Sequence, residues 1–108
     1  MAEGTRNPGD TAVAIPKTRT AKRVAKPPPY KVLLHNDDYT TMEFVVQTLE
    51  EIFDKGPAEA YRIMMEVHTR GRGVCGAYSF EVAETKVAKV HESARAEGFP
   101  LRAGIEEA

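Results

Sequence analysis

Two short segments of the sequence carry side chains that could bind a charged ligand. The first is an acidic loop, Asn36-Asp37-Asp38, and the second ends at His68. Amide oxygen, carboxylate and neutral imidazole nitrogen all accept hydrogen bonds, so together they suit a cation with several N–H donors. Apolar residues accompany both segments and would suit a bulky apolar group: Met42, Val45, Met64 and Val67. A free protein N-terminus that begins with Leu, Phe, Tyr or Trp presents an ammonium and such a group at once.

Each of these features also has an ordinary structural explanation. The acidic loop could be a polar turn at the end of a strand, although adjacent carboxylates repel and need a cation or a helix N-terminus nearby. His68 could be a hydrogen-bonded core residue, and the apolar side chains could be core positions. Methionine is unbranched and polarizable, so Met42 and Met64 could instead line a pocket that accepts several large apolar groups.

Metal binding and nucleophilic catalysis find less support in the sequence. Carboxylate and imidazole suit several divalent ions, but the helices lack His-x-x-x-His or Glu-x-x-His spacing. Cys75 falls inside a predicted strand, where a buried structural thiol is the expected role. Because no nucleophile–base pair or metal set is evident, we expect a protein that is not an enzyme and needs no metal or cofactor.

The predicted elements follow the order β-α-α-β-α-β. Alternation predicts a strand over residues 30–35, which the acidic loop ends. A helix should begin near Thr40, where Thr40-x-x-Glu43 fits a capping box whichever threonine is the cap, and end at residues 54–56. Its apolar stripe recurs at helical spacing: Met42, Val45, Val46, Leu49, Ile52 and Phe53.

The second half of the predicted domain holds two helices and two strands. Pro57 suits the first position of a helix that Gly71 ends, with this inward face: Ala60, Ile63, Met64, Val67 and His68. Residues 74–80 are predicted as a strand with Tyr78 and Phe80 on one side, followed by a helix over about 81–97. That helix ends at Gly98, with Phe99 as an apolar clasp, and turns these residues inward: Ala83, Val87, Val90 and Ala94. A final short strand alternates through Leu101, Ala103 and Ile105. We therefore predict an α+β sandwich, a three-stranded antiparallel or mixed sheet packed against three helices.

Length and composition indicate one small globular domain in the cytoplasm. The chain has 108 residues, of which 42% are hydrophobic and 29% charged. Its single cysteine cannot form an internal disulfide, and without a secretory signal this indicates a reducing cytosol. No apolar run approaches the roughly 18 residues needed to span a membrane, so no membrane partner is expected.

The net charge of −1 hides an uneven distribution along the chain. Residues 1–29 carry six Lys or Arg and two acids, a charge of +4, whereas residues 30–108 carry nine and fourteen, a charge of −5. We predict a flexible basic extension over residues 1–29, closed by Pro27–Pro29, and a folded core over 30–108. An alternative is a nucleic-acid- or ribosome-associated module that binds through this arm. The arm has no aromatic residue to stack a base, so nucleic acid is not the expected partner.

Six segments together resemble a known family: Tyr30-Lys-Val-Leu-Leu, Asn36-Asp-Asp-Tyr-Thr, Met42-Glu-Phe-Val, Met64-x-x-Val-His68, Val74-Cys-Gly and Glu81-Val-Ala-Glu-Thr-Lys-Val-Ala88. In this combination the sequence, over roughly residues 28–108, resembles the ClpS family, the N-degron adaptors of the Clp protease. The resemblance implies a small non-catalytic adaptor. Such a protein captures N-termini that begin with Leu, Phe, Tyr or Trp and delivers them to the AAA+ unfoldase ClpA, which feeds the ClpP peptidase.

The resemblance also implies residue roles. By position, Asn36, Asp37 or Asp38, and His68 would bind the α-amino group, with the directly contacting aspartate left open. Met42 would be the gate that limits β-branched first residues. The implied lining of the hydrophobic pocket is Leu34, Thr40, Met42, Val45, Met64, Val67 and Leu101.

Delivery is implied by two further regions. Glu81 and Lys86 lie in a stretch that resembles the surface docking on the unfoldase's N-terminal domain, although a solvated helix start would look the same. The N-terminal extension resembles the family's mobile arm, and 29 residues reach at most about 95–105 Å when fully extended. Thr41 stands where the family often has proline; because proline would pre-set the first helical turn, we expect Thr41 to loosen the pocket rim slightly.

Overall fold

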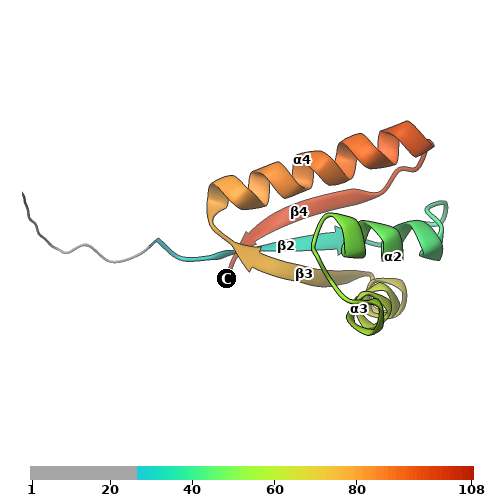
Figure 1. Cartoon of the computed structure of the whole chain (residues 1–108), viewed down its shortest axis with the longest axis horizontal. Coiled ribbons are helices and arrows are strands. Elements are labelled where there is room, and N and C mark those ends of the chain that lie inside the picture. Colours follow the sequence, from blue (N-terminus) through green and yellow to red (C-terminus); the bar gives the residue numbers. More distant parts are fainter. Residues whose placement is uncertain (1–26) are drawn as a thin grey trace, which may run out of the picture.

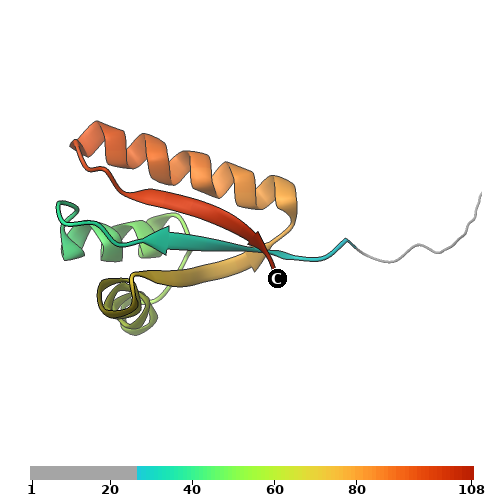
Figure 2. The same ribbon diagram turned by 180° about the vertical axis from the view of Figure 1, so that it is seen from behind.

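The computed structural model describes residues 27–108, which form a three-stranded sheet covered by three helices (Figures 1 and 2). The elements are β2 (Tyr30–His35), α2 (Met42–Glu51), α3 (Pro57–Arg70), β3 (Arg72–Tyr78), α4 (Phe80–Glu97) and β4 (Arg102–Glu107). The order and the α+β class confirm the prediction from sequence. The predicted flexible extension lies, apart from residues 27–29, outside the described residues.

The sheet is antiparallel, with β2 in the centre of the order β3-β2-β4. Tyr30 pairs with Tyr78 on one side and with Glu107 on the other, and His35 pairs with Arg72 and Arg102. The β2–β3 register shifts between Val32 and Leu33, where β3 carries a bulge. Of the two sheet types left open by the sequence, the antiparallel one is therefore correct.

One hydrophobic core joins the helices to a single face of the sheet. Val32 and Leu34 of β2 are completely buried, and Cys75 of β3 is 1% exposed. The helices contribute Leu49, Ile63 and Val90 to the same core. Burying each large apolar side chain stabilises the fold by roughly 1.5–3 kcal/mol, so this layer fixes the positions of the helices.

The start of α2 agrees with the prediction, which left open which threonine is the cap, but its buried face differs. Thr41 is the N-cap, and its hydroxyl accepts a hydrogen bond of 3.1 Å from the Phe44 N–H. Thr40 faces the acidic loop instead. The buried face of α2 is Phe44, Val45, Thr48 and Leu49, whereas Met42 is 42% exposed. The predicted stripe was therefore wrong at its start, because Phe44 turns inward to meet Phe99, with ring centroids 5.0 Å apart.

The boundary between β3 and α4 also differs from the prediction. Residues 74–80 were predicted as a strand, but β3 ends at Tyr78 and Phe80 begins α4. The Ser79 hydroxyl caps α4 by accepting a hydrogen bond from the Val82 N–H, and such a cap favours helix over strand. Phe80 stays 46% exposed and stacks edge-on against Tyr30.

The predicted ends of α3 and α4 are confirmed. Gly71 and Gly98 follow these helices with φ of 91° and 78°, the left-handed conformation in which glycine has no steric penalty. The Phe99 N–H donates to the Ala94 carbonyl at 2.8 Å, which closes the end of α4. Within the described part of the chain, no helix is long and apolar enough to cross a bilayer.

Candidate functional site

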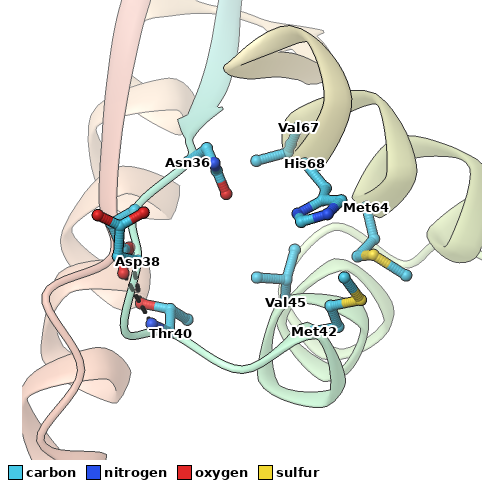
Figure 3. A pocket seen from close by; sticks show the side chains of 9 residues that line it. Asn36, Asp38, Thr40, Met42, Val45, Met64, Val67 and His68 are labelled. Atoms are coloured by element: carbon cyan, nitrogen blue, oxygen red, sulfur yellow. Dashed lines mark hydrogen bonds between the residues drawn. The ribbon is translucent and has the colours of Figure 1, made fainter.

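A pocket of about 230 Å³ lies where the loop after β2 meets the start of α2 and the last turns of α3 (Figure 3). It brings together residues that are about 30 positions apart in the sequence. Nine of the residues predicted to bind a ligand line it: Asn36, Asp37, Asp38, Thr40, Met42, Val45, Met64, Val67 and His68. Asn36, Asp38 and Thr40 lie on one side of the pocket, and His68 lies across from them beside the apolar side chains (Figure 3).

A backbone hydrogen bond joins the two halves of the site. The Asn36 N–H donates to the carbonyl oxygen of Gly71 at 2.8 Å. Gly71 can receive this bond because its left-handed conformation turns the chain sharply after α3. The bond holds the end of β2 against the end of α3, so the Asn36 side chain and His68 border the same pocket (Figure 3).

The two aspartates have different surroundings. Asp37 Oδ1 accepts hydrogen bonds from the N–H groups of Tyr39 and Thr40 at 2.8 and 2.7 Å, and its Oδ2 accepts one from the Thr40 hydroxyl at 2.7 Å. Burial opposes ionisation of this carboxyl, but the hydrogen bonds from Thr40 and Tyr39 outweigh it and lower the Asp37 pKa. Asp37 therefore shapes the loop as a charged, hydrogen-bonded turn residue.

Asp38 is exposed at the pocket, and no donor from residues 27–108 hydrogen-bonds its carboxylate. A carboxylate without an internal partner is available to a ligand. The loop thus separates two roles that look interchangeable in the sequence, with Asp37 organising the backbone and Asp38 facing the pocket.

His68 is exposed on the last turn of α3. Its imidazole lies at the pocket near Met64 (Figure 3), so its surroundings differ from those of a buried core histidine. A neutral imidazole has one nitrogen that accepts a hydrogen bond and one that donates. His68 can therefore accept a bond from a ligand N–H on the side of the pocket opposite the acidic loop.

The apolar wall is mostly buried. The side chains of Val45, Met64 and Val67 are 6%, 4% and 2% exposed, and together they form the hydrophobic lining of the pocket. Met42 differs, because it is the first residue of α2 and its side chain is 42% exposed at the edge of the pocket. It is therefore the most exposed of the apolar residues that line the pocket.

Two residues predicted as pocket lining lie elsewhere. Leu34 is completely buried in the core between β2 and the helices. Leu101 is 3% exposed and borders a separate hollow with His91 and Phe99. Both belong to the layer behind the pocket rather than to its wall, because their side chains fill the space between sheet and helices.

Both predicted partner-binding residues lie on α4, Glu81 in its first turn and Lys86 in its second. Glu81 is exposed, between the exposed side chains of Phe80 and Val82. Lys86 has internal contacts: its Nζ donates to the carbonyl oxygen of Ile52 at 2.7 Å and lies 5.1 Å from the ring centroid of Tyr78. This ammonium supplies a positive charge to the C-terminal end of α2, which has no basic residue in its last turn.

The role of Asp37 in organising the loop was not predicted from the sequence. The signal was present as an Asp followed two and three residues later by the groups it binds, which is typical of an Asx turn. Tyr61 was not predicted as a surface feature either; it is 57% exposed and lines a neighbouring groove together with Met42 and Met64.

Other chemistries have little basis in the described residues. Cys75 is buried, and burial raises the pKa of its thiol to about 12, so a reactive thiolate is not present at neutral pH. Within residues 27–108, no three His, Cys, Asp or Glu side chains lie close enough together to hold a metal ion.

Comparison with known proteins identifies the family of the chain. Residues 25–104 match the family described as "ATP-dependent Clp protease adaptor protein ClpS". The chain belongs to the ClpS family. Its function is therefore that of a Clp protease adaptor. Its partners are the Clp protease and the substrates of that protease.

Individual ClpS proteins are similar over most of their length. The ClpS adapter of Nitratidesulfovibrio vulgaris (strain DSM 19637 / Miyazaki F) is 62% identical over 84 residues, which cover 78% of this chain and 84% of the relative. That of Desulfatibacillum aliphaticivorans is 55% identical over 89 residues, covering 82% and 86%. Among solved structures, Agrobacterium tumefaciens ClpS2 bound to L-phenylalaninamide is 36% identical with a TM-score of 0.74. That match covers 77% of this chain and 100% of ClpS2.

Proposed function

We propose that this ClpS protein binds free N-termini that begin with Leu, Phe, Tyr or Trp and delivers them to a ClpA-type unfoldase for degradation by ClpP. The observation that carries the proposal is the pocket itself. It sets hydrogen-bond acceptors from two elements beside a buried apolar wall, and a free hydrophobic N-terminus needs both.

Three side chains would bind the α-ammonium group. An ammonium has three N–H donors, and Asn36, Asp38 and His68 offer an amide oxygen, a carboxylate and an imidazole nitrogen at the pocket. Asp38 is the proposed direct carboxylate, because the oxygens of Asp37 already accept three hydrogen bonds inside the loop. Asp37 would act by holding that loop in place and by adding negative charge nearby.

The first side chain of the substrate would lie against Val45, Met64 and Val67. Burying a Leu or Phe side chain contributes roughly 1.5–3 kcal/mol. Each charge-assisted hydrogen bond to the ammonium adds about 1.5–3 kcal/mol before desolvation is subtracted. After the entropy cost of association, the sum corresponds to micromolar affinity, about 8 kcal/mol.

The structural relative supports this assignment of the ligand. L-phenylalaninamide, bound by Agrobacterium ClpS2, combines an α-amino group with an aromatic side chain and lacks a free carboxylate. It therefore resembles the first residue of a polypeptide. The 36% identity and complete coverage of ClpS2 make it a suitable guide to the ligand class of this chain.

Delivery would use the opposite end of the molecule. Glu81 and its exposed neighbours Phe80 and Val82 would dock on the N-terminal domain of the unfoldase. Lys86 already donates one N–H to the Ile52 carbonyl, so only its remaining N–H donors would be available to the unfoldase. The basic extension of residues 1–29 would be engaged by the unfoldase during transfer, in the cytoplasm.

The proposal is tested by reconstituted degradation. A folded reporter that begins with Leu and one that begins with Met are incubated with ClpA, ClpP and ATP, with and without the adaptor. We expect the adaptor to accelerate loss of the Leu reporter at least fivefold and to leave the Met reporter unchanged. Equal effects on both reporters, or the same acceleration by the His68→Ala variant, would contradict the proposed recognition.

A further inference from the structure

A hollow of about 250 Å³ lies where the end of α4 meets the start of β4 (Figure 1). None of the described residues lines both this hollow and the pocket that follows β2. We name it the α4–β4 hollow. No Asp or Glu of residues 27–108 lines it. Its main lining residues combine two guanidinium groups and an imidazole with apolar side chains: His91, Arg95, Phe99, Pro100, Leu101 and Arg102.

The two arginines of the hollow lack an internal acceptor. Arg95 and Arg102 are exposed, and within residues 27–108 neither forms an ion pair or a side-chain hydrogen bond. Arg62 and Arg72, by contrast, each form an ion pair with a glutamate. A guanidinium presents its N–H donors in a planar fork that matches the two oxygens of a carboxylate. The side chains of Arg95 and Arg102 are therefore available to an external anion.

His91 shows that the two positive charges converge. Burial, followed by the charges of Arg102 and Arg95, lowers the pKa of its imidazole, so both guanidinium groups act on the same ring. His91 Nε2 accepts a hydrogen bond from the Ala103 N–H at 3.0 Å, which places the proton of the neutral ring on Nδ1. The imidazole therefore retains one N–H donor of its own.

The local structure accounts for only one of the two arginines. Arg95 lies in the last turn of α4, where a positive charge interacts favourably with the helix dipole. Arg102 lies directly opposite His35 of β2, which in turn lies opposite Arg72 of β3. Cross-strand neighbours stabilise a sheet when their charges are opposite, and this row offers Arg102 no negative charge. An anion from outside the chain would supply it.

We propose that the α4–β4 hollow binds a carboxylate that carries an apolar group, as an organic acid or the C-terminal residue of a polypeptide does. Arg95 and Arg102 would hold the carboxylate oxygens, and the apolar group would lie on Phe99, Pro100 and Leu101. Inorganic phosphate would satisfy the arginines but leave these apolar side chains uncovered. The site is independent of the pocket proposed for free N-termini.

The test titrates the full-length protein with N-acetyl-leucine and follows its N–H signals by NMR. The acetyl group removes the ammonium that the other pocket is proposed to bind. We expect the Ala103 N–H and the arginine side-chain signals to shift with a Kd of about 1 mM, as a few charge-assisted hydrogen bonds at an exposed site would give, while the Asn36 N–H stays unchanged. N-acetyl-leucinamide, which lacks the carboxylate, should bind at least tenfold more weakly, and inorganic phosphate at least threefold more weakly.

Matched variants separate the hollow from general positive charge. Arg95→Gln and Arg102→Gln should each weaken binding of N-acetyl-leucine at least fivefold in a protein whose NMR spectrum remains that of the folded chain. Lys89 is an exposed cation on α4 outside the hollow, so Lys89→Gln should leave the affinity unchanged. No shift at the hollow, equal binding of the acid and its amide, tighter binding of phosphate, or equal losses in Arg102→Gln and Lys89→Gln would overturn the site.

A further probe distinguishes the two sources of the carboxylate. An N-acetylated peptide that ends in Leu should bind as tightly as N-acetyl-leucine if the hollow accepts polypeptide C-termini. It should bind more weakly if the hollow takes small organic acids, because the preceding residues would then clash with the rim.

Discussion

Asp37 and Asp38 are neighbours in the sequence, yet the structure gives them different tasks. Asp37 accepts three hydrogen bonds from Thr40 and Tyr39, and Asp38 accepts none from the residues that the structure describes. The sequence motif identified the loop but left the roles of the two carboxylates open. The difference arises from backbone geometry, which decides which carboxylate reaches the N–H groups two and three residues further along.

This difference predicts that substituting Asp38 affects peptide affinity, whereas substituting Asp37 affects stability. Asp38→Ala should weaken binding of a Leu-starting peptide at least tenfold with little change in stability. Asp37→Ala should lower the free energy of unfolding by about 1–2 kcal/mol, because the loop loses its hydrogen-bond acceptor. Peptide anisotropy and urea unfolding measure the two quantities. Wild-type affinity in a folded Asp38→Ala protein would assign the ammonium contact to another group.

Met42 should set the size and shape of accepted first residues. Its exposed side chain borders the pocket, so Met42→Ala removes bulk at the edge without emptying the core. We expect the variant to bind Ile- and Val-starting peptides at least threefold more tightly than the wild type, because a β-branched side chain gains room. Competition with a labelled Leu-starting peptide gives the affinities. If the Ile-starting peptide competes equally well against wild type and Met42→Ala, Met42 does not select the first residue.

At the scale of elements, local patterns predicted most of the fold but not every face. Pro57, Gly71 and Gly98 marked helix ends correctly because their backbone preferences act locally. The start of α2 was predicted correctly, but its buried face was not, because Phe44 packs against Phe99, a residue more than fifty positions away. The family resemblance implied Leu34 and Leu101 as pocket lining, whereas both side chains lie in the core layer behind the pocket.

The contact between α4 and β4 should make stability depend on pH. The Ala103 N–H donates to His91 Nε2 at 3.0 Å. Because only a neutral imidazole has a ring nitrogen that can accept, this bond is lost when His91 is protonated. Burial, and then the positive charges of Arg102 and Arg95, lower the His91 pKa below its ordinary value of 6.5. As pH falls below about 6.5 the unfolded chain takes up this proton first, so stability falls until the folded pKa is reached.

We therefore expect the free energy of unfolding to decrease between pH 7 and pH 5.5. Urea unfolding at both values measures it. His91→Gln keeps a side-chain acceptor but cannot titrate, so this variant should lose part of the pH dependence. The same pH dependence in wild type and variant would show that other groups cause it.

At the scale of the whole molecule, the two proposed functions occupy opposite ends of β2 (Figure 1). The chain enters the sheet at Tyr30, beside the exposed start of α4, and the pocket follows His35 at the other end. A six-residue strand spans about 20 Å. A bound substrate would therefore leave the surface around Glu81 open to the unfoldase.

This separation predicts that the N-terminal extension acts in delivery rather than in recognition. Removing residues 1–26 should leave the affinity for a Leu-starting peptide within twofold of the full chain and abolish accelerated degradation of a Leu reporter. The competing assignment of the arm to nucleic acid predicts RNA or DNA binding that falls steeply with salt and disappears on truncation. Loss of peptide binding on truncation would contradict the assignment of recognition to the pocket.

The central claim is that the pocket recognises a free, bulky hydrophobic N-terminus, and acetylation tests it most directly. Two labelled peptides that start with Leu and differ only in N-terminal acetylation are compared by fluorescence anisotropy. Acetylation removes the charge and leaves a single N–H donor, so Asp38 and His68 would lose their partners on burial. We predict micromolar binding of the free amine and at least a hundredfold loss on acetylation. Equal affinity for both peptides would contradict the account.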